Sequence, residues 1–147
     1  VRIAAGALGR NVPAQDLLVS QQHRILVRSA IAARMFGAQE LLVAAKHLTE
    51  VEGIDILPDT AGVTYVHLMF GAHEILTSNG AETESLYTGA EALRAVGRAA
   101  RAEILELFPA LRHGVPGAPA RPLVRGRQAR SLAARHLRNL RPLVGMH

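Results

Sequence analysis

The first half of the chain has the hydrophobic pattern of short strands separated by polar turns. Residues 17–27, LLVSQQHRILV, contain two aliphatic runs that flank a polar break, and Ser20 and His23 lie in that break. The runs predict two short strands joined by a turn. The hydroxyl and the imidazole have two interpretations. They form an ordinary turn in which the serine caps a backbone amide and the histidine packs, or they form a site that acts on a peptide bond.

A second region of strand pattern follows near the middle of the chain. The stretch 63–70, VTYVHLMF, is dense in β-branched, aromatic and aliphatic residues and predicts one strand. Residues 73–78 and 81–87 predict two more, with Asn79 and Gly80 between them. Asn-Gly is the strongest short hairpin signal, because both central residues of a type I′ turn take positive φ. We therefore expect a three-stranded meander.

The second half of the chain is helical in pattern. An i, i+3, i+4 stripe predicts a helix that Pro109 ends, and its members are Leu93, Val96, Ala100, Ile104, Leu107, Phe108 and Leu111. A last helix is predicted over 125–140, with an apolar face of Ala129, Leu132, Ala133, His136, Leu137 and Leu140. No acidic residue follows Glu106, so the other face of this helix has one sign of charge.

These patterns predict a mainly β fold, followed by two C-terminal α-helices. The expected organisation is a β domain over 1–88, a helical extension over 89–112, a Pro/Gly linker over 113–124 and an Arg-rich amphipathic helix and tail over 125–147. Hydrophobic residues make up 49% of the chain, which suits one domain with a core. No apolar run approaches the roughly 18 residues that cross a bilayer.

Charge and cysteine content limit the candidate chemistry. Cysteine is absent, which removes disulfides, thiolate metal sites and a cysteine nucleophile from this chain. The net charge of +5 comes almost wholly from arginine, with Lys46 the only lysine. Such a bias more often reflects codon composition than phosphate recognition. We therefore expect the tail helix to dock on the sheet with a solvated Arg face, rather than to bind nucleic acid or an acidic membrane.

Histidines are the candidate chemical groups. Five of the seven are expected to have surface or packing roles: His113, His136 and His147 in the linker and tail, His47 in a short helical turn and His67 within a strand. His23 and His73 instead stand where an apolar strand meets a turn, from which an imidazole can point into a cleft. Zinc-binding His-x-x-x-His, a phosphate loop and Gly-x-Ser-x-Gly are all missing, so no metal, cofactor or small-molecule substrate is expected.

Two phrases resemble the Hint family, the Hedgehog/intein autoprocessing fold. Residues 5–27, AGALGRNVPAQDLLVSQQHRILV, are similar to the middle of the Hint module in bacterial proteins, with Ser20-Gln21-Gln22-His23 in the place of the family's Thr-x-x-His. Residues 63–86 resemble the C-terminal block of the module, which His73, Asn79 and Gly80 match. The resemblance covers residues 1–87 and implies a horseshoe-like β fold.

The resemblance implies self-cleavage of the peptide bond that precedes the domain, by an N-to-S/O acyl shift. A nucleophile at the module's first residue attacks the preceding carbonyl carbon, and the amide nitrogen must gain a proton to leave. An imidazole with a pKa of about 6.5 can donate that proton, which contributes about 10²–10⁴-fold. In this interpretation Ser20 orients the bond, His23 protonates its nitrogen, His73 is a second proton carrier and Asn79 belongs to the C-terminal site. The partner is an upstream segment of the same polypeptide.

The chain also departs from the family. The opening block with its Cys or Ser nucleophile is not in this chain, and Val1 has no nucleophilic side chain, so we expect a fragment that is inactive by itself. An intein ends in His-Asn, whereas Glu84 and Ser85 stand near that place and cannot cyclise. The alternative is a non-catalytic structural or interaction domain of a larger, exported bacterial protein. A sheet without its first strands would have an unpaired edge, through which copies could self-associate.

Overall fold

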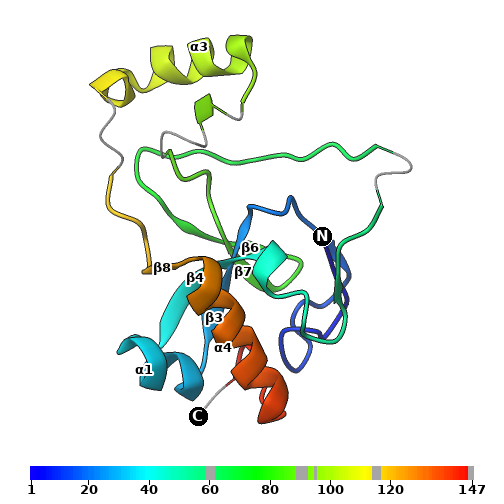
Figure 1. Cartoon of the computed structure of the whole chain (residues 1–147). Helices are drawn as coiled ribbons and strands as arrows, with labels where there is room; N and C mark the ends of the chain where they lie inside the picture. Colours follow the sequence, from blue (N-terminus) through cyan, green and yellow to red (C-terminus); the bar gives the residue numbers. More distant parts are fainter. Residues whose placement is uncertain (59–61, 89–92, 95, 114–116, 146–147) are drawn as a thin grey trace.

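The computed structural model describes residues 1–58, 62–88, 93–94, 96–113 and 117–145, and its eight strands form two sheets (Figure 1). The first sheet has the order β2-β1-β5 and is antiparallel: β1 (Arg2–Ile3), β2 (Leu17–Leu18) and β5 (Ile54–Asp55). The second has the order β6-β7-β3-β4-β8: β3 (Arg24–Arg28), β4 (Glu40–Ala44), β6 (Ile75–Ser78), β7 (Ala81–Glu84) and β8 (Leu123–Val124). The described helices are α1 (Ala30–Phe36), α3 (Arg98–Leu107) and α4 (Gly126–Arg138), with 3₁₀ turns η1 (Ala45–His47) and η2 (Pro109–His113). The predicted mainly β fold with C-terminal helices is confirmed.

β3 is the central strand of the larger sheet and directly follows the Ser20–His23 break. Ile25 lies opposite Val43 of β4 on one side and opposite Thr83 of β7 on the other. Ile25, Leu26 and Val27 are at most 1% exposed, so both faces of β3 are covered. β2 and β3 are the two strands that the aliphatic runs of residues 17–27 predict.

The Asn-Gly hairpin forms as predicted. β6 and β7 pair in register from Ile75 opposite Glu84 to Ser78 opposite Ala81. Asn79 and Gly80 have φ values of 50° and 82°, the positive values that a type I′ turn requires. The hairpin has two strands, however, and not three.

The predicted strand at residues 63–70 is wrong. This stretch has no regular secondary structure, and Figure 1 shows it as an extended run outside both sheets. Leu86 donates one backbone hydrogen bond to the carbonyl of Leu68, at 2.7 Å, but one bond is not a ladder. Val66 is 79% and Leu68 55% exposed. β-branched and aromatic residues favour a pleated, half-buried surface, and without a paired neighbour that preference does not produce a strand.

Residues 117–145 are part of the same fold. β8 pairs in parallel with β4, with Leu42 opposite Leu123 and Val43 opposite Val124. This strand lies within the predicted Pro/Gly linker, so the expectation of a structureless linker is wrong there. Backbone hydrogen bonds join Arg28 to Leu143 and Gly145, which fixes the tail beside β3.

The predicted apolar face of the last helix is correct for four of its six members. Ala129, Leu132, Ala133 and His136 of α4 are buried in the core. Leu137 is 46% exposed, because it lies about 100° around the helix from His136. Leu140 is 89% exposed, since α4 ends at Arg138 and the positive φ of Leu140 (49°) departs from helical geometry.

α3 ends before Pro109, as predicted, but none of its residues is buried. Figure 1 shows this helix standing apart from both sheets. The predicted helix starts further upstream, and Ala95 of that stretch lies outside the described residues. Among the described helices, none is both long and apolar enough to cross a bilayer.

Candidate functional site

The Ser20–His23 turn connects the two sheets and is formed by the backbone. The His23 amide donates to the carbonyl of Ser20 at 3.1 Å. The Ser20 hydroxyl is half-buried and makes no hydrogen bond within the described part of the chain. η1 holds the turn from outside, because Ala45 donates to the His23 carbonyl at 2.9 Å and Lys46 to that of Gln21 at 3.1 Å. The serine therefore does not cap the turn, and its hydroxyl is free for another partner.

Val1 lies beside this turn. Its amino group donates to the carbonyl of Val19 at 2.8 Å, and the Val19 amide donates back to the carbonyl of Val1 at 3.0 Å. Val19 directly precedes Ser20. The start of the chain and the Ser20–His23 turn are thus neighbours in space as a result of strand pairing.

The His23 ring is packed against a second imidazole. Its ring stacks on that of His67, with centroids 5.4 Å apart and an interplanar angle of 24°. Its Nε2 atom is buried and has no hydrogen-bond partner among the described residues. Burial lowers the pKa of His23 below 6.5; the nearby Glu84 carboxylate raises it, while His67 and Arg24 lower it further. Neutral His23 therefore predominates at pH 7, more strongly than in an unperturbed imidazole.

His67 is a site neighbour that the hydrophobic pattern did not identify. It was expected to be a half-buried packing residue within a strand, and both parts of that expectation are wrong. His67 is exposed, lies in the extended 62–72 segment and covers one face of the His23 ring. Only the folded chain brings the two rings together across 44 positions, so no local pattern could predict the contact.

His73 is held by hydrogen bonds on both ring nitrogens. The Ala120 amide donates to Nδ1 at 3.0 Å, so Nδ1 is unprotonated. Nε2 then has the proton and donates to Oε2 of Glu84, also at 3.0 Å. The His73 side chain is only 2% exposed, and the Tyr87 ring lies 4.8 Å from it. These contacts define the neutral Nε2–H tautomer of His73.

Glu84 connects the two candidate histidines. Its Oε1 accepts the backbone amide of Arg24 at 2.9 Å, directly after His23, while its Oε2 accepts from His73. The Arg24 guanidinium donates to both carboxylate oxygens, at 3.1 and 3.3 Å. A carboxylate that is 8% exposed is stabilised in the folded state by such charge-assisted bonds. The sequence placed Glu84 near the end of the module without a role, because its partners lie 60 and 11 positions away.

Asn79 lies apart from this cluster. It is at the turn end of the β6–β7 hairpin, whereas Glu84 is at the other end. The Asn79 side-chain amide donates to the backbone carbonyl of Asp16 at 3.0 Å. The backbone carbonyl of Asn79 accepts the Ala14 amide at 2.7 Å. The structure thus links His23 and His73 through Glu84, which binds the His73 ring and the Arg24 amide, while the described hydrogen bonds of Asn79 go to residues 14–16.

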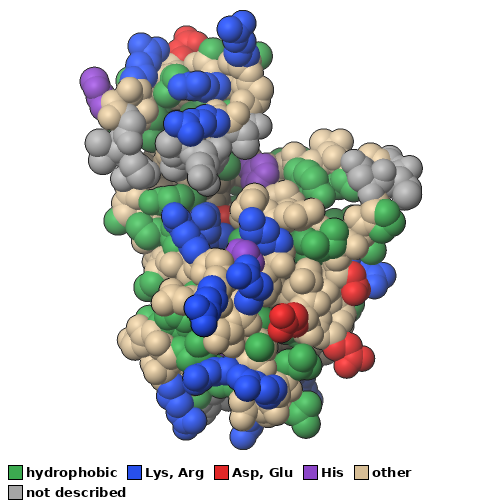
Figure 2. Space-filling model, viewed as in Figure 1, with side chains coloured by type: hydrophobic (Ala, Val, Ile, Leu, Met, Phe, Trp, Pro, Cys, Tyr) green, Lys and Arg blue, Asp and Glu red, His purple; other side chains and the backbone are tan. Residues whose placement is uncertain are grey.

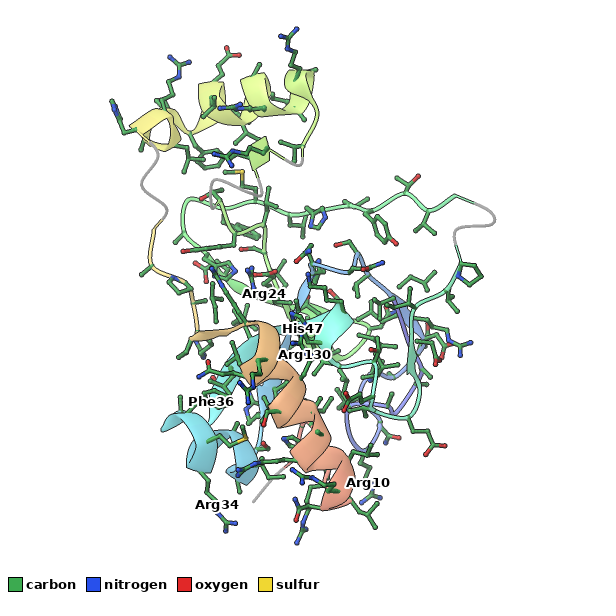
Figure 3. All side chains as sticks on the ribbon, viewed as in Figure 1. Arg10, Arg24, Arg34, Phe36, His47 and Arg130 are labelled. Atoms are coloured by element: carbon green, nitrogen blue, oxygen red, sulfur yellow. The ribbon has the colours of Figure 1, made fainter. Side chains whose placement is uncertain are left out.

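The remaining described histidines have other environments. His47 is half-buried in η1, and burial, followed by Lys46 and Arg130, lowers its pKa; Figure 3 shows it beside Arg130. His136 is buried in α4, and burial also lowers its pKa. His113 is exposed, and His147 lies outside the described residues. Within the described residues, no group of three His, Cys, Asp or Glu side chains is arranged to hold a metal ion.

Comparison with known proteins gives one match. The sequence model of a family described as the Hint domain matches residues 1–90, more than half of the chain. The matched segment contains the Ser20–His23 turn, His67, His73 and Glu84. No curated protein and no solved structure matches the chain.

Proposed function

This chain belongs to the Hint domain family, and we propose that it supplies the proton donor for self-cleavage of a peptide bond that precedes the domain. The reaction is an acyl shift. A hydroxyl or thiol upstream of Val1 attacks the preceding carbonyl carbon, the C–N bond breaks, and an ester or thioester forms. The nucleophile loses one proton, and the departing nitrogen gains one. His23 is the residue that we assign to that transfer.

The observation that supports this assignment is the buried, unpartnered Nε2 of His23. A buried polar atom without a hydrogen bond costs about 1–3 kcal/mol, so its presence in a folded chain calls for an explanation. Here it lies in a turn whose Ser20 hydroxyl also has no described hydrogen bond and which follows Val19, the backbone partner of Val1. A peptide bond presented there would meet a ring nitrogen and a hydroxyl from one rigid turn.

Ser20 and His67 have separate positioning roles in this proposal. The hydroxyl of Ser20 donates a hydrogen bond to the peptide carbonyl and holds the bond near His23. The ring of His67 covers His23 and keeps water from one of its faces. Because burial lowers the pKa of His23, its protonated form is scarce at pH 7 but is a better proton donor than an unperturbed imidazolium. The cleavage rate should therefore increase as the pH falls below neutrality.

A non-catalytic interaction domain is the second candidate function, and the contacts of His73 favour it. Both nitrogens of that ring are occupied, one by Glu84 and one by Ala120, which lies outside the family match. His73 cannot transfer a proton unless one of these bonds breaks. A Hint domain whose second histidine has become structural would keep the fold without complete processing.

Hydroxylamine distinguishes the two candidates. The test uses the full chain preceded by its natural upstream residues, and hydroxylamine attacks an ester or thioester but not an amide. The proposal predicts hydroxylamine-dependent cleavage at the nucleophile, with a hydroxamate at the new C-terminus by mass spectrometry. An upstream residue without a hydroxyl or thiol, or a precursor that stays intact in hydroxylamine, would support the interaction domain.

A further inference from the structure

A cavity of about 640 Å³ lies between α1, α4 and the C-terminal tail, away from the Ser20–His23 turn. Arginines from three separate segments line it: Arg34 of α1, Arg135 of α4 and Arg141 of the tail. Figure 3 shows Arg34 on α1, and Figure 2 shows Lys and Arg side chains gathered at this end of the molecule. We propose that this cavity is a binding site for a small phosphate-bearing anion.

The charge of the cavity is not neutralised by the protein. No acidic side chain lines it, and within the described ranges none of its three arginines forms an ion pair. The sequence accounts for part of this absence of acidic side chains, because no Asp or Glu follows Glu106. The arginines that do form ion pairs lie elsewhere: Arg2, Arg24, Arg28 and Arg121. Three like charges around one cavity repel each other, and a bound anion would remove that repulsion.

The supporting framework is rigid and buried. The His136 ring accepts the Ser29 hydroxyl proton at Nε2, at 2.9 Å, and faces the carbonyl of Arg141 with Nδ1, at 3.1 Å. The Arg141 amide in turn donates to the His136 carbonyl at 3.0 Å. Since His136 is 1% exposed, these bonds fix the start of α1, the end of α4 and the backbone of Arg141 relative to one another. The backbone segments that carry the three arginines are therefore held relative to one another, and the exposed guanidinium groups extend from them.

The lining defines the chemical class of the ligand. Guanidinium groups present planar forks that bind phosphate oxygens through paired hydrogen bonds. Ser29 adds little, because its hydroxyl proton already binds His136, and one of the two amide protons of Asn139 binds the Arg135 carbonyl. Ile31 and Pro142 give the cavity an apolar wall. The volume falls within the roughly 300–1,000 Å³ of small-molecule sites, so it can hold a phosphate with an organic group or a second phosphate.

The test is titration calorimetry of the full chain with inorganic phosphate and with pyrophosphate, at constant ionic strength set by sodium chloride. The double variant Arg34→Gln/Arg141→Gln should weaken binding of pyrophosphate by about a hundredfold, since each of the two charge-assisted bonds that are lost is worth about a factor of ten. The matched control is Arg127→Gln/Arg138→Gln, which removes the same charge from exposed positions outside the cavity and should bind as the parent does. Thermal unfolding checks that both variants fold.

Vesicles of phosphatidylcholine, with and without phosphatidic acid, distinguish a lipid headgroup from a soluble phosphate. Vesicle binding that requires phosphatidic acid and is lost with Arg34→Gln/Arg141→Gln would identify a headgroup as the source. Binding of pyrophosphate alone would identify a soluble ligand. The proposal is overturned if neither probe binds, or if the cavity variant and the control variant lose affinity equally, because the protein would then have only a general basic surface.

Discussion

The rings of His23 and His67 stack at a centroid distance of 5.4 Å, although one belongs to the turn before β3 and the other to an exposed segment without regular structure. This contact covers one face of the imidazole that we propose as the proton donor. The His67 ring also disfavours the charged form of His23. The protonation of His23 thus depends on a segment that lies outside both sheets.

The first prediction concerns the protonation of His23. Its pKa should lie below 6.5 in the full chain, and His67→Ala should raise it, because the variant removes both burial and a ring whose interaction lowers the His23 pKa. Ring proton shifts recorded by NMR across the pH range measure this directly. The exposed His113 provides the control, since His113→Ala should leave the His23 titration unchanged. A His23 pKa that does not respond to His67→Ala would show that the stacking contact is absent in solution.

Stability should decrease in mildly acidic solution. Burial lowers the pKa of His23, His47 and His136 relative to the unfolded value of about 6.5. Below that pH the unfolded chain binds protons that the folded chain does not, so the free energy of unfolding falls as the pH falls toward the folded pKa values. Urea unfolding at about pH 7.5 and about pH 5.5 should show a lower midpoint in acid. Glu40 does not interfere, because hydrogen bonds from Arg121 and Arg28 hold its pKa below this window.

An unchanged or higher urea midpoint at the lower pH would contradict that prediction. A variant also tests whether the histidines cause this pH dependence of stability. His47→Gln removes one of the three groups and should reduce the pH dependence, whereas His113→Gln should not.

Ser29→Ala should destabilise the fold more than a surface serine variant does. The hydroxyl of Ser29 accepts the Ala32 amide at 3.0 Å as the N-cap of α1, and donates to buried His136. Loss of the cap costs about 1 kcal/mol, and an unpaired buried ring nitrogen about 1–3 kcal/mol more. Chemical denaturation should therefore show a loss of about 2–4 kcal/mol. Ser131→Ala, an exposed position in α4, is the matched control, and equal losses in the two variants would contradict the account.

Glu84→Ala should also be strongly destabilising. It leaves Arg24 and the His73 Nε2–H without their shared acceptor in a site where the carboxylate is 8% exposed. Removing one member of a buried pair costs about 3–5 kcal/mol, and the partial exposure of Arg24 places the expected loss near the lower value, about 3 kcal/mol. Glu52→Ala, at an exposed position, should change stability by less than about 0.5 kcal/mol. A Glu84 variant as stable as the Glu52 variant would show that the cluster contributes nothing to folding.

Local chemistry explains which elements could be predicted from the sequence. The hairpin at Asn79 and Gly80 depends on the φ preferences of two adjacent residues, and the α4 face depends on a repeat within one helix. Residues 63–70 have equally strong strand composition, but a strand also needs a neighbouring backbone, which composition does not specify. β8 shows the converse, because pairing with β4 makes a strand from a Pro/Gly-rich stretch.

The candidate site was predictable in part for the same reason. The Ser20–His23 turn is a local motif, so the sequence identifies it and its neighbour in the family pattern, His73. Glu84 and His67 belong to the site through contacts with residues far away in the sequence. The sequence around these two residues does not indicate those contacts. Ser20 and His23 share one backbone-bonded turn, but their roles in cleavage stay a prediction.

The central claim is that His23 protonates the leaving nitrogen of an upstream peptide bond. The most direct measurement is the rate of self-cleavage of the full chain preceded by its natural upstream residues, followed on a gel for the parent, His23→Ala and the control His47→Ala. The account predicts a parent that cleaves faster as the pH falls below 7, a loss of about 10²-fold or more in His23→Ala, and little change in His47→Ala. A His23→Ala precursor that cleaves at the parental rate, or a parent that never cleaves, would contradict it.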